Sequence, residues 1–221
     1  MSKSPRPLAL EISPKKVKSS EDIMELSERQ ENSLALLIKS INLKSEEAIP
    51  LLEASLKYAE DNLSATEYLS YLYLEVNRPK DCLDVCNKIL EKLSHSPNCT
   101  ELSLNVNNNK TVALNILGRY SESIVILEEC LKFHQTEKLY KNLADAYFSI
   151  GIYDKAIYNY EKAVSLSDNY DEAHYNLAVC LFMQENYYNA KFAIAKAVQH
   201  SPKNATYLEL QKEIGLRIKE F

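Results

Sequence analysis

The strongest constraint on the fold of this chain is an internal repeat with a period of 34 residues. When residues 137–170 are placed over residues 171–204 without a gap, matching residues coincide: Leu143-Ala144 on Leu177-Ala178, Tyr153 on Tyr187, Ala156 on Ala190, and Ala163 on Ala197. A period of this length fits a pair of antiparallel helices, which cannot bury its apolar faces alone and therefore stacks on neighbouring pairs. The 221 residues include only 3 Gly and 7 Pro, too few turn residues for a many-stranded sandwich or barrel. The sequence therefore predicts an all-α fold.

The residues that recur in these two copies resemble the tetratricopeptide repeat. The first copy contains Tyr140, Leu143, Ala144, Tyr147, Gly151, Tyr153, Ala156, Tyr160 and Ala163. The second contains His174, Leu177, Ala178, Leu181, Tyr187, Ala190, Ile194, Ala197 and Pro202. The first copy departs from the family at Asp168, where Pro is usual, and the second at His174, where an aromatic residue is usual. The resemblance implies a right-handed α-solenoid of antiparallel helix pairs.

Weaker copies extend the predicted repeat domain over residues 21–221. They are a degenerate repeat at 29–62, repeats at 63–96 and 104–137, and a capping helix at 205–221 whose inner positions would be Leu208, Leu210, Ile214 and Ile218. Residues 97–103 are predicted to be an insertion between repeats. Residues 105–109 are rich in Asn, a poor helix former, so the helix there is expected to be short or shifted.

Residues 1–20 are predicted to be a disordered basic arm. They contain Lys3, Arg6, Lys15, Lys16 and Lys18 against Glu11 alone, without apolar periodicity. The segment Ser13-Pro14-Lys15-Lys16 resembles a site for proline-directed kinases, which makes Ser13 a candidate for phosphorylation; an uncommitted arm is the alternative. Neither a signal peptide nor an apolar run of roughly 20 residues is visible, so we expect a cytoplasmic protein, with a nuclear or ciliary location also compatible.

The sequence predicts no catalytic, cofactor-binding or metal-binding site. It lacks a Gly-rich phosphate loop, a nucleophile elbow and paired His residues at metal spacing. The five cysteines are Cys82, Cys86, Cys99, Cys130 and Cys180; their odd number and the missing export signal favour reduced thiols. The net charge of −5 argues against general nucleic-acid binding.

A partner-binding groove is expected on the concave side of the stack, which the first helix of each pair lines. The apolar residues predicted to face it are Tyr71, Leu74, Val112, Ile116, Phe148, Tyr175, Val179, Phe182 and Met183. An amphipathic helix or extended peptide could lay its apolar face there. The alternatives are that the final helix covers part of this surface, or that the assumed helix rotation is wrong by one position.

The resemblance implies a protein-interaction scaffold or adaptor, as one subunit of a larger assembly such as a ciliary trafficking or cell-cycle complex. A second hypothesis is a co-chaperone that grips acidic C-terminal tails with a two-carboxylate clamp. The family's clamp needs Asn where this chain has Asp145, and Lys and Arg where it has Thr206 and Leu210. Asp145 would repel a carboxylate, so this hypothesis is disfavoured. A third hypothesis is an enzyme with an unrecognised site.

Overall fold

The computed structural model describes residues 20–93 and 101–219, and all regular elements in these ranges are α-helices. Residues 1–19 of the predicted basic arm, with Ser13 among them, and Cys99 lie outside the described residues, while Ser20 begins the first helix. The chain forms two compact units, one within residues 1–95 and the other within residues 96–221. We call them unit 1 and unit 2 and describe each by itself.

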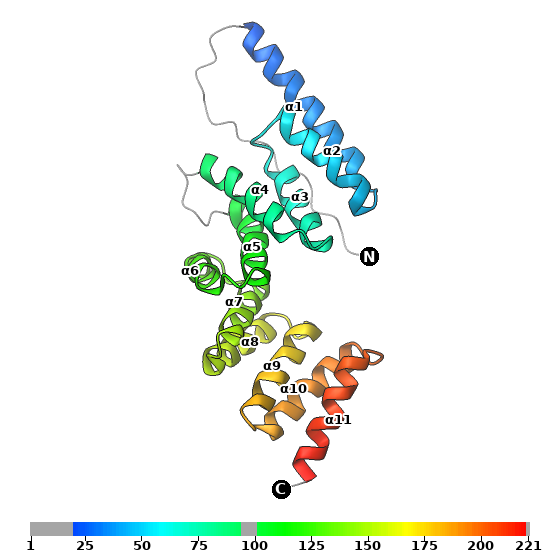
Figure 1. Ribbon diagram of the computed structural model, residues 1–221, viewed down its shortest axis with the longest axis vertical. Coiled ribbons are helices and arrows are strands. Elements are labelled where there is room, and N and C mark those ends of the chain that lie inside the picture. Colours follow the sequence, from blue (N-terminus) through cyan, green and yellow to red (C-terminus); the bar gives the residue numbers. More distant parts are fainter. Residues whose placement is uncertain (1–19, 94–100, 220–221) are drawn as a thin grey trace. The chain divides into compact units, whose positions relative to one another are not determined.

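Unit 1 contains two helix pairs, which are α1 (Ser20–Ser40), α2 (Ser45–Tyr58), α3 (Leu63–Glu75) and α4 (Pro79–Lys92). Each helix packs against the next in the chain, and Figure 1 shows α1 and α2 side by side. Hydroxyl groups tie this first pair together, because the side chains of Ser33 and Ser55 are hydrogen-bonded at 2.8 Å and both are buried. The helix α2 begins at Ser45, where the sequence placed the second helix of the degenerate repeat.

Unit 2 contains three helix pairs and a final helix, which are α5 (Glu101–Ile116), α6 (Tyr120–Leu131), α7 (Glu137–Ser149), α8 (Tyr153–Leu166), α9 (Asp171–Met183), α10 (Tyr187–His200) and α11 (Ala205–Lys219). Successive helices are in contact, and α5 also contacts α7 (Figure 1). Small residues occupy the matching positions of the two copies that define the repeat: Ala144, Ala156, Ala178 and Ala190 are all fully buried. A side chain larger than a methyl group would not fit there without moving a helix.

The helix α5 is not short, although its Asn residues are poor helix formers. It runs for 16 residues and begins three residues before the predicted repeat boundary. Asn side chains join it to α7, since Asn142 Nδ2 donates to Asn108 Oδ1 at 2.8 Å and Asn115 Nδ2 donates to the carbonyl of Asn142 at 3.2 Å. These contacts outweigh the weak intrinsic preference of Asn for a helix.

The final helix packs on unit 2 through three of its four predicted inner residues, and Tyr207 takes the place of Leu208. Tyr207 and Ile214 are buried, Leu210 and Ile218 are partly buried, and Leu208 is 41% exposed. The correction at Leu208 follows from the rotation of the helix, which directs Tyr207 instead against Tyr175 of α9, with ring centroids 4.9 Å apart.

Candidate functional site

A hollow of about 230 Å³ opens between the first helices α7 and α9 of unit 2. Its lining combines two apolar residues with polar and charged ones, which are Lys141, Asp145, Phe148, Ser149, Tyr160, Glu172, Asn176 and Val179. All but Tyr160 come from α7 or α9. The hollow is therefore lined mainly by first helices of unit 2, from which the predicted groove residues of this unit also come.

Asp145 is the centre of the polar wall. One of its oxygens accepts a hydrogen bond from the hydroxyl of Tyr160 at 2.5 Å and another from Asn176 Nδ2 at 3.2 Å. The other oxygen lies 3.0 Å from Lys141 Nζ. These three donors come from α8, α9 and α7, so one carboxylate ties three helices together.

Lys141 bridges two carboxylates. Its Nζ lies 2.5 Å from Glu172 Oε1 on α9 as well as 3.0 Å from Asp145, and only 14% of its side chain is exposed. Burial by itself would lower the pKa of Lys141, but Asp145 and Glu172 outweigh it, and the pKa is raised. The lysine therefore remains charged, and the wall holds one cation against two anions.

Buried groups beside Asp145 remain protonated. Burial, followed by the charge of Asp145 and the hydrogen bond to it, raises the pKa of the Tyr160 hydroxyl well above its ordinary value. Burial and the same carboxylate raise the pKa of the Cys180 thiol to about 12. Both groups are therefore poor nucleophiles at neutral pH, and the arrangement favours binding over catalysis.

The predicted groove residues divide between the two units. Two of them, Tyr71 and Leu74, lie on α3 of unit 1, where Tyr71 is 47% exposed and its hydroxyl donates to Glu75. The other seven lie in unit 2. Among those seven, the structure brings Phe148 and Val179 together in the hollow.

Three of the predicted groove residues also support the fold. Tyr175 stacks on Tyr207, so the final helix covers this residue. The ring of Phe182 packs edge-on against Tyr187 with centroids 5.4 Å apart, and that of Phe148 lies 5.6 Å from Tyr153. The remaining residues differ in exposure: Val112 is partly buried, while Ile116 and Met183 are 52% and 55% exposed.

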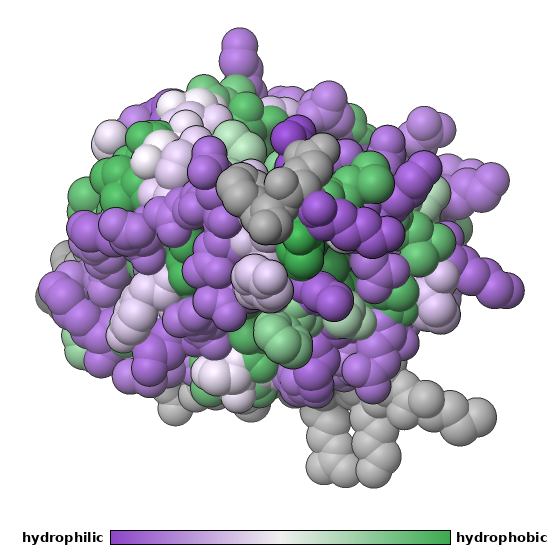
Figure 2. All heavy atoms as spheres, turned by 90° about the horizontal axis from the view of Figure 1, so that it is seen from below, coloured by the Kyte–Doolittle hydropathy of each residue, from purple (hydrophilic) through white to green (hydrophobic). Residues whose placement is uncertain are grey.

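The hollow is a better candidate for a binding site than the exposed apolar side chains are. Single large apolar side chains are exposed on many described helices, and Figure 2 shows them in small groups among hydrophilic residues. The sequence reasoning missed the charged wall, because it considered Asp145 only as a departure from the carboxylate clamp. A four-residue spacing could have suggested the Lys141–Asp145 pair, but no local pattern points to Glu172, 31 residues further on.

The cysteines require one correction. Cys130 is disulfide-bonded, so the expectation of reduced thiols is wrong for this residue. Cys82, Cys86 and Cys180 are buried and carry no disulfide. Within residues 20–93 and 101–219, no cluster of three His, Cys, Asp or Glu side chains could hold a metal ion. In the same residues, no helix has both the length and the apolar character needed to cross a bilayer.

Two family models match the second half of the chain. One is described as TPR repeat and matches residues 144–184, and the other is described as tetratricopeptide repeat and matches residues 171–204. No curated protein matches the sequence.

Several solved structures share the fold at low sequence identity. MamA from Desulfovibrio magneticus RS-1, from residue 41 to its end, is 15% identical with a TM-score of 0.63, covering 82% of this chain and 97% of that one. PilW, a type IV pilus biogenesis factor, is 15% identical with a TM-score of 0.71, covering 88% and 86%. YrrB, a TPR protein with an unusual peptide-binding site, is 16% identical with a TM-score of 0.59, covering 86% and 97%.

The matched models and the helix architecture agree. The models cover the two copies that define the 34-residue period, and the structure places these copies in α7–α10 as two stacked helix pairs. This all-α repeat fold is shared with the solved tetratricopeptide-repeat proteins, which as a class hold other proteins. The chain therefore contains tetratricopeptide repeats, which the family models place within residues 144–204.

Proposed function

We propose that this protein is a non-catalytic scaffold that binds a segment of another polypeptide on the first-helix side of unit 2. The observation that carries the proposal is the hollow bounded by Phe148 and Val179, with the Lys141–Glu172 pair at its wall. The hollow is large enough for one aliphatic or aromatic side chain, which is the kind of anchor that dominates peptide recognition.

The charges beside the hollow favour a partner with a basic residue next to its apolar anchor. The wall carries two carboxylates and one ammonium group, and the side chain of Glu172 is 52% exposed and so accessible to a partner. Asp145 already accepts from three donors, so Glu172 is the carboxylate that an incoming donor can engage. The same negative balance disfavours the co-chaperone hypothesis, because an acidic tail would be repelled.

A peptide-binding role has a precedent in one structural neighbour, YrrB, a TPR protein with an unusual peptide-binding site. We propose, in addition, that the protein acts as one subunit of a larger complex, of the ciliary trafficking or cell-cycle type that the resemblance includes.

The test compares two double substitutions, each of which replaces two apolar or aromatic side chains with Gln. The site variant carries Val179→Gln and Met183→Gln on α9, and the control carries Tyr188→Gln and Phe192→Gln on α10, whose side chains are 68% and 72% exposed. Tyr175 and Phe182 are left unchanged because both pack against other rings, so replacing them would reduce stability.

The measurement is affinity capture from a native extract with quantitative mass spectrometry, alongside helical circular dichroism of each variant. We expect the site variant to capture at least about tenfold less of each specific partner, which corresponds to roughly 1.4 kcal/mol of binding free energy. The control should retain them, with unchanged helical signal in both. Partners that survive in the site variant, or disappear in the control, would show that binding occurs elsewhere.

A further inference from the structure

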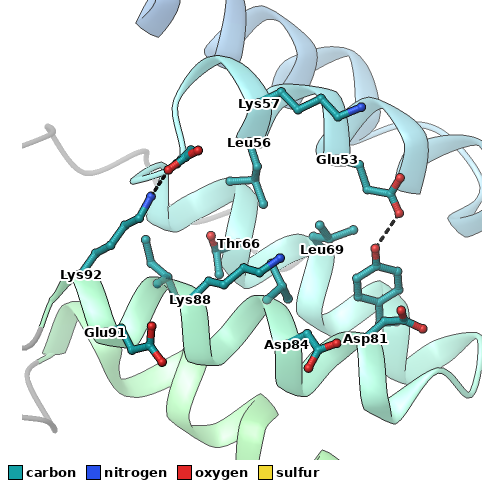
Figure 3. A pocket seen from close by; sticks show the side chains of 14 residues that line it. Glu53, Leu56, Lys57, Thr66, Leu69, Asp81, Asp84, Lys88, Glu91 and Lys92 are labelled. Carbon is teal, nitrogen blue, oxygen red and sulfur yellow. Dashed lines mark hydrogen bonds and ion pairs between the residues drawn. The ribbon is translucent and has the colours of Figure 1, made fainter.

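A second and larger cavity lies in unit 1, between the second helices α2 and α4. Its volume is about 750 Å³, and Thr66 and Leu69 of α3 form its floor (Figure 3). Tyr73 of α3 also lines it. Leu56 of α2 and Val85 of α4 are half-buried at its sides. We call this cavity the α2–α4 groove. Neither Tyr71 nor Leu74 of α3 lines it, so it is separate from the predicted partner-binding surface.

The rim of the α2–α4 groove is predominantly acidic. Its carboxylates are Glu53, Glu60, Asp81, Asp84 and Glu91, against the ammonium groups of Lys57, Lys88 and Lys92. Three of these carboxylates have partners within unit 1: Glu60 pairs with Lys92, Glu53 accepts from the Tyr73 hydroxyl at 2.6 Å, and Asp81 pairs with Arg78 at 2.8 Å.

Two carboxylates on the rim are available for a cationic ligand. Asp84 and Glu91 lie on α4, both are exposed, and no ion pair among the described residues engages either of them. In Figure 3 the stem of Lys88 extends across the mouth of the groove. Because a lysine stem is flexible, its ammonium group can move into solvent when another group enters.

The chain itself contains a segment whose chemistry complements this groove. Within residues 1–19, five basic side chains stand against one acidic side chain. Between the basic groups, Leu8, Leu10 and Ile12 alternate with other residues, so an extended backbone would place all three on one face. An apolar strip flanked by cations matches a groove that has an apolar floor and an acidic rim.

The position of α1 places this segment within reach. The hydrogen bond between Ser33 and Ser55 marks one level along the antiparallel pair α1 and α2. From that level, α1 extends 13 residues, about 20 Å, back to its first residue. In the same direction, α2 extends three residues, about 5 Å, to its last residue. The start of α1 and the end of α2 therefore lie at the same end of the pair, next to the Glu60–Lys92 end of the groove. An extended chain from Ser20 back to Leu8–Ile12 spans about 25–40 Å, which exceeds this separation.

We propose that residues 8–18 of this chain bind in the α2–α4 groove. Leu8, Leu10 and Ile12 contact its apolar lining, and Lys15, Lys16 and Lys18 face Asp84 and Glu91. Because the segment is covalently attached, its effective concentration is in the millimolar range, so a weak interaction is sufficient for occupancy. Phosphorylation at Ser13 would add about two negative charges beside the lysines and weaken the contact.

The experiment uses the full chain with Leu10→p-benzoylphenylalanine, a photo-crosslinking residue, and maps the products by mass spectrometry. We expect intramolecular links to residues 53–92, with a yield that does not depend on protein concentration and falls as salt is raised from 0.15 to 1 M, because the Debye length shrinks from about 8 to 3 Å.

Two charge-reversal variants test the acidic rim. Asp84→Lys with Glu91→Lys should reduce the link to the groove at least about fivefold, an effect of roughly 1 kcal/mol, while Glu161→Lys with Glu209→Lys, exposed in unit 2 and equal in charge change, should leave it unchanged. Ser13→Glu should reduce the link and Ser13→Ala should not. All these substitutions lie outside the unit 2 hollow, so partner capture by the unit 2 site is expected to persist.

Three results would overturn the proposal. Links to the exposed apolar residues Leu34 and Ile38 of α1, or to Ile41 directly after it, would identify a different docking face on unit 1. A crosslinked dimer would identify a second copy as the occupant. Links scattered over both units, or equal loss in the two charge-reversal variants, would show that the segment makes only non-specific electrostatic contacts.

Discussion

Asp145 holds three helices of unit 2 together through a single side chain. It accepts hydrogen bonds from Tyr160 and Asn176 and pairs with Lys141, which in turn pairs with Glu172. A carboxylate that is three-quarters buried is costly unless each of its oxygens has a partner, and here both do. Its first role is therefore structural, and it shapes the wall of the hollow as a consequence.

Removing this carboxylate should therefore reduce stability. Asp145→Ala leaves Lys141 with one partner instead of two and leaves the buried hydroxyl of Tyr160 without its acceptor. We expect a loss of about 1–3 kcal/mol in the free energy of unfolding, measured by urea denaturation. The matched change Tyr160→Phe removes one donor only and should cost about 1 kcal/mol. An Asp145 variant as stable as the parent would show that the network contributes nothing.

The turn between the two helices of a pair has the same construction four times. At Asn77, Gly118, Gly151 and Glu185 the backbone angle φ is positive, between 56° and 77°. The amide of the following residue then bonds back to the carbonyl five residues earlier, as Ile152 does to Tyr147 at 2.9 Å and Asn186 to Leu181 at 2.9 Å. This is the Schellman motif, in which a left-handed residue ends the helix and satisfies its last carbonyls.

Because Gly adopts this conformation without strain and Glu does not, substitutions at the two positions should have opposite effects. Gly151→Ala should lower the free energy of unfolding by about 1 kcal/mol, since a Cβ there meets no neighbouring atom and only the backbone is strained. Glu185→Gly should raise the free energy of unfolding by up to about 1 kcal/mol, and the melting temperature should rise with it. Thermal denaturation followed by circular dichroism measures both, and equal signs for the two variants would contradict the explanation.

Unit 2 as a whole is a stack in which each helix contacts mainly its neighbours in the chain. The helix α11 contacts α10 and α9 but closes the end of the stack, with Ile214 fully buried. In such an arrangement, the free energy of unfolding is close to a sum of local and nearest-neighbour contributions. A destabilising substitution at one end should therefore affect the nearby helices most and the distant helices least.

We therefore expect Ile214→Ala to have a graded effect along unit 2. The lost methylene groups should cost about 2–4 kcal/mol locally, seen as faster amide hydrogen exchange in α9–α11 than in α5 and α6. Leu216→Ala, at a side chain that is 47% exposed on the same helix, is the control and should leave exchange nearly unchanged. An equal increase over all of unit 2 would indicate a single cooperative core instead.

The elements were predictable from sequence, whereas the site was predictable only in part. Small residues such as Ala144 and Ala156, and the turn residue Gly151, recur at a fixed period because each repeat must meet the same local geometry. Phe148 and Val179 were predicted as groove residues from their helical register. The polar half of the hollow was not predicted, because it depends on which side chains of α7, α8 and α9 meet in space.

The sequence by itself determined the fold class, since a 34-residue period of apolar and small residues can bury its surface only by stacking helix pairs. It could not determine that Tyr207 would cover Tyr175, that Glu172 would pair with Lys141, or that Cys130 would be disulfide-bonded. The physical reason is that periodicity is a local property, repeated along one helix, whereas these contacts depend on the rotation and approach of different helices. Those were decided only by the packing of the tertiary structure.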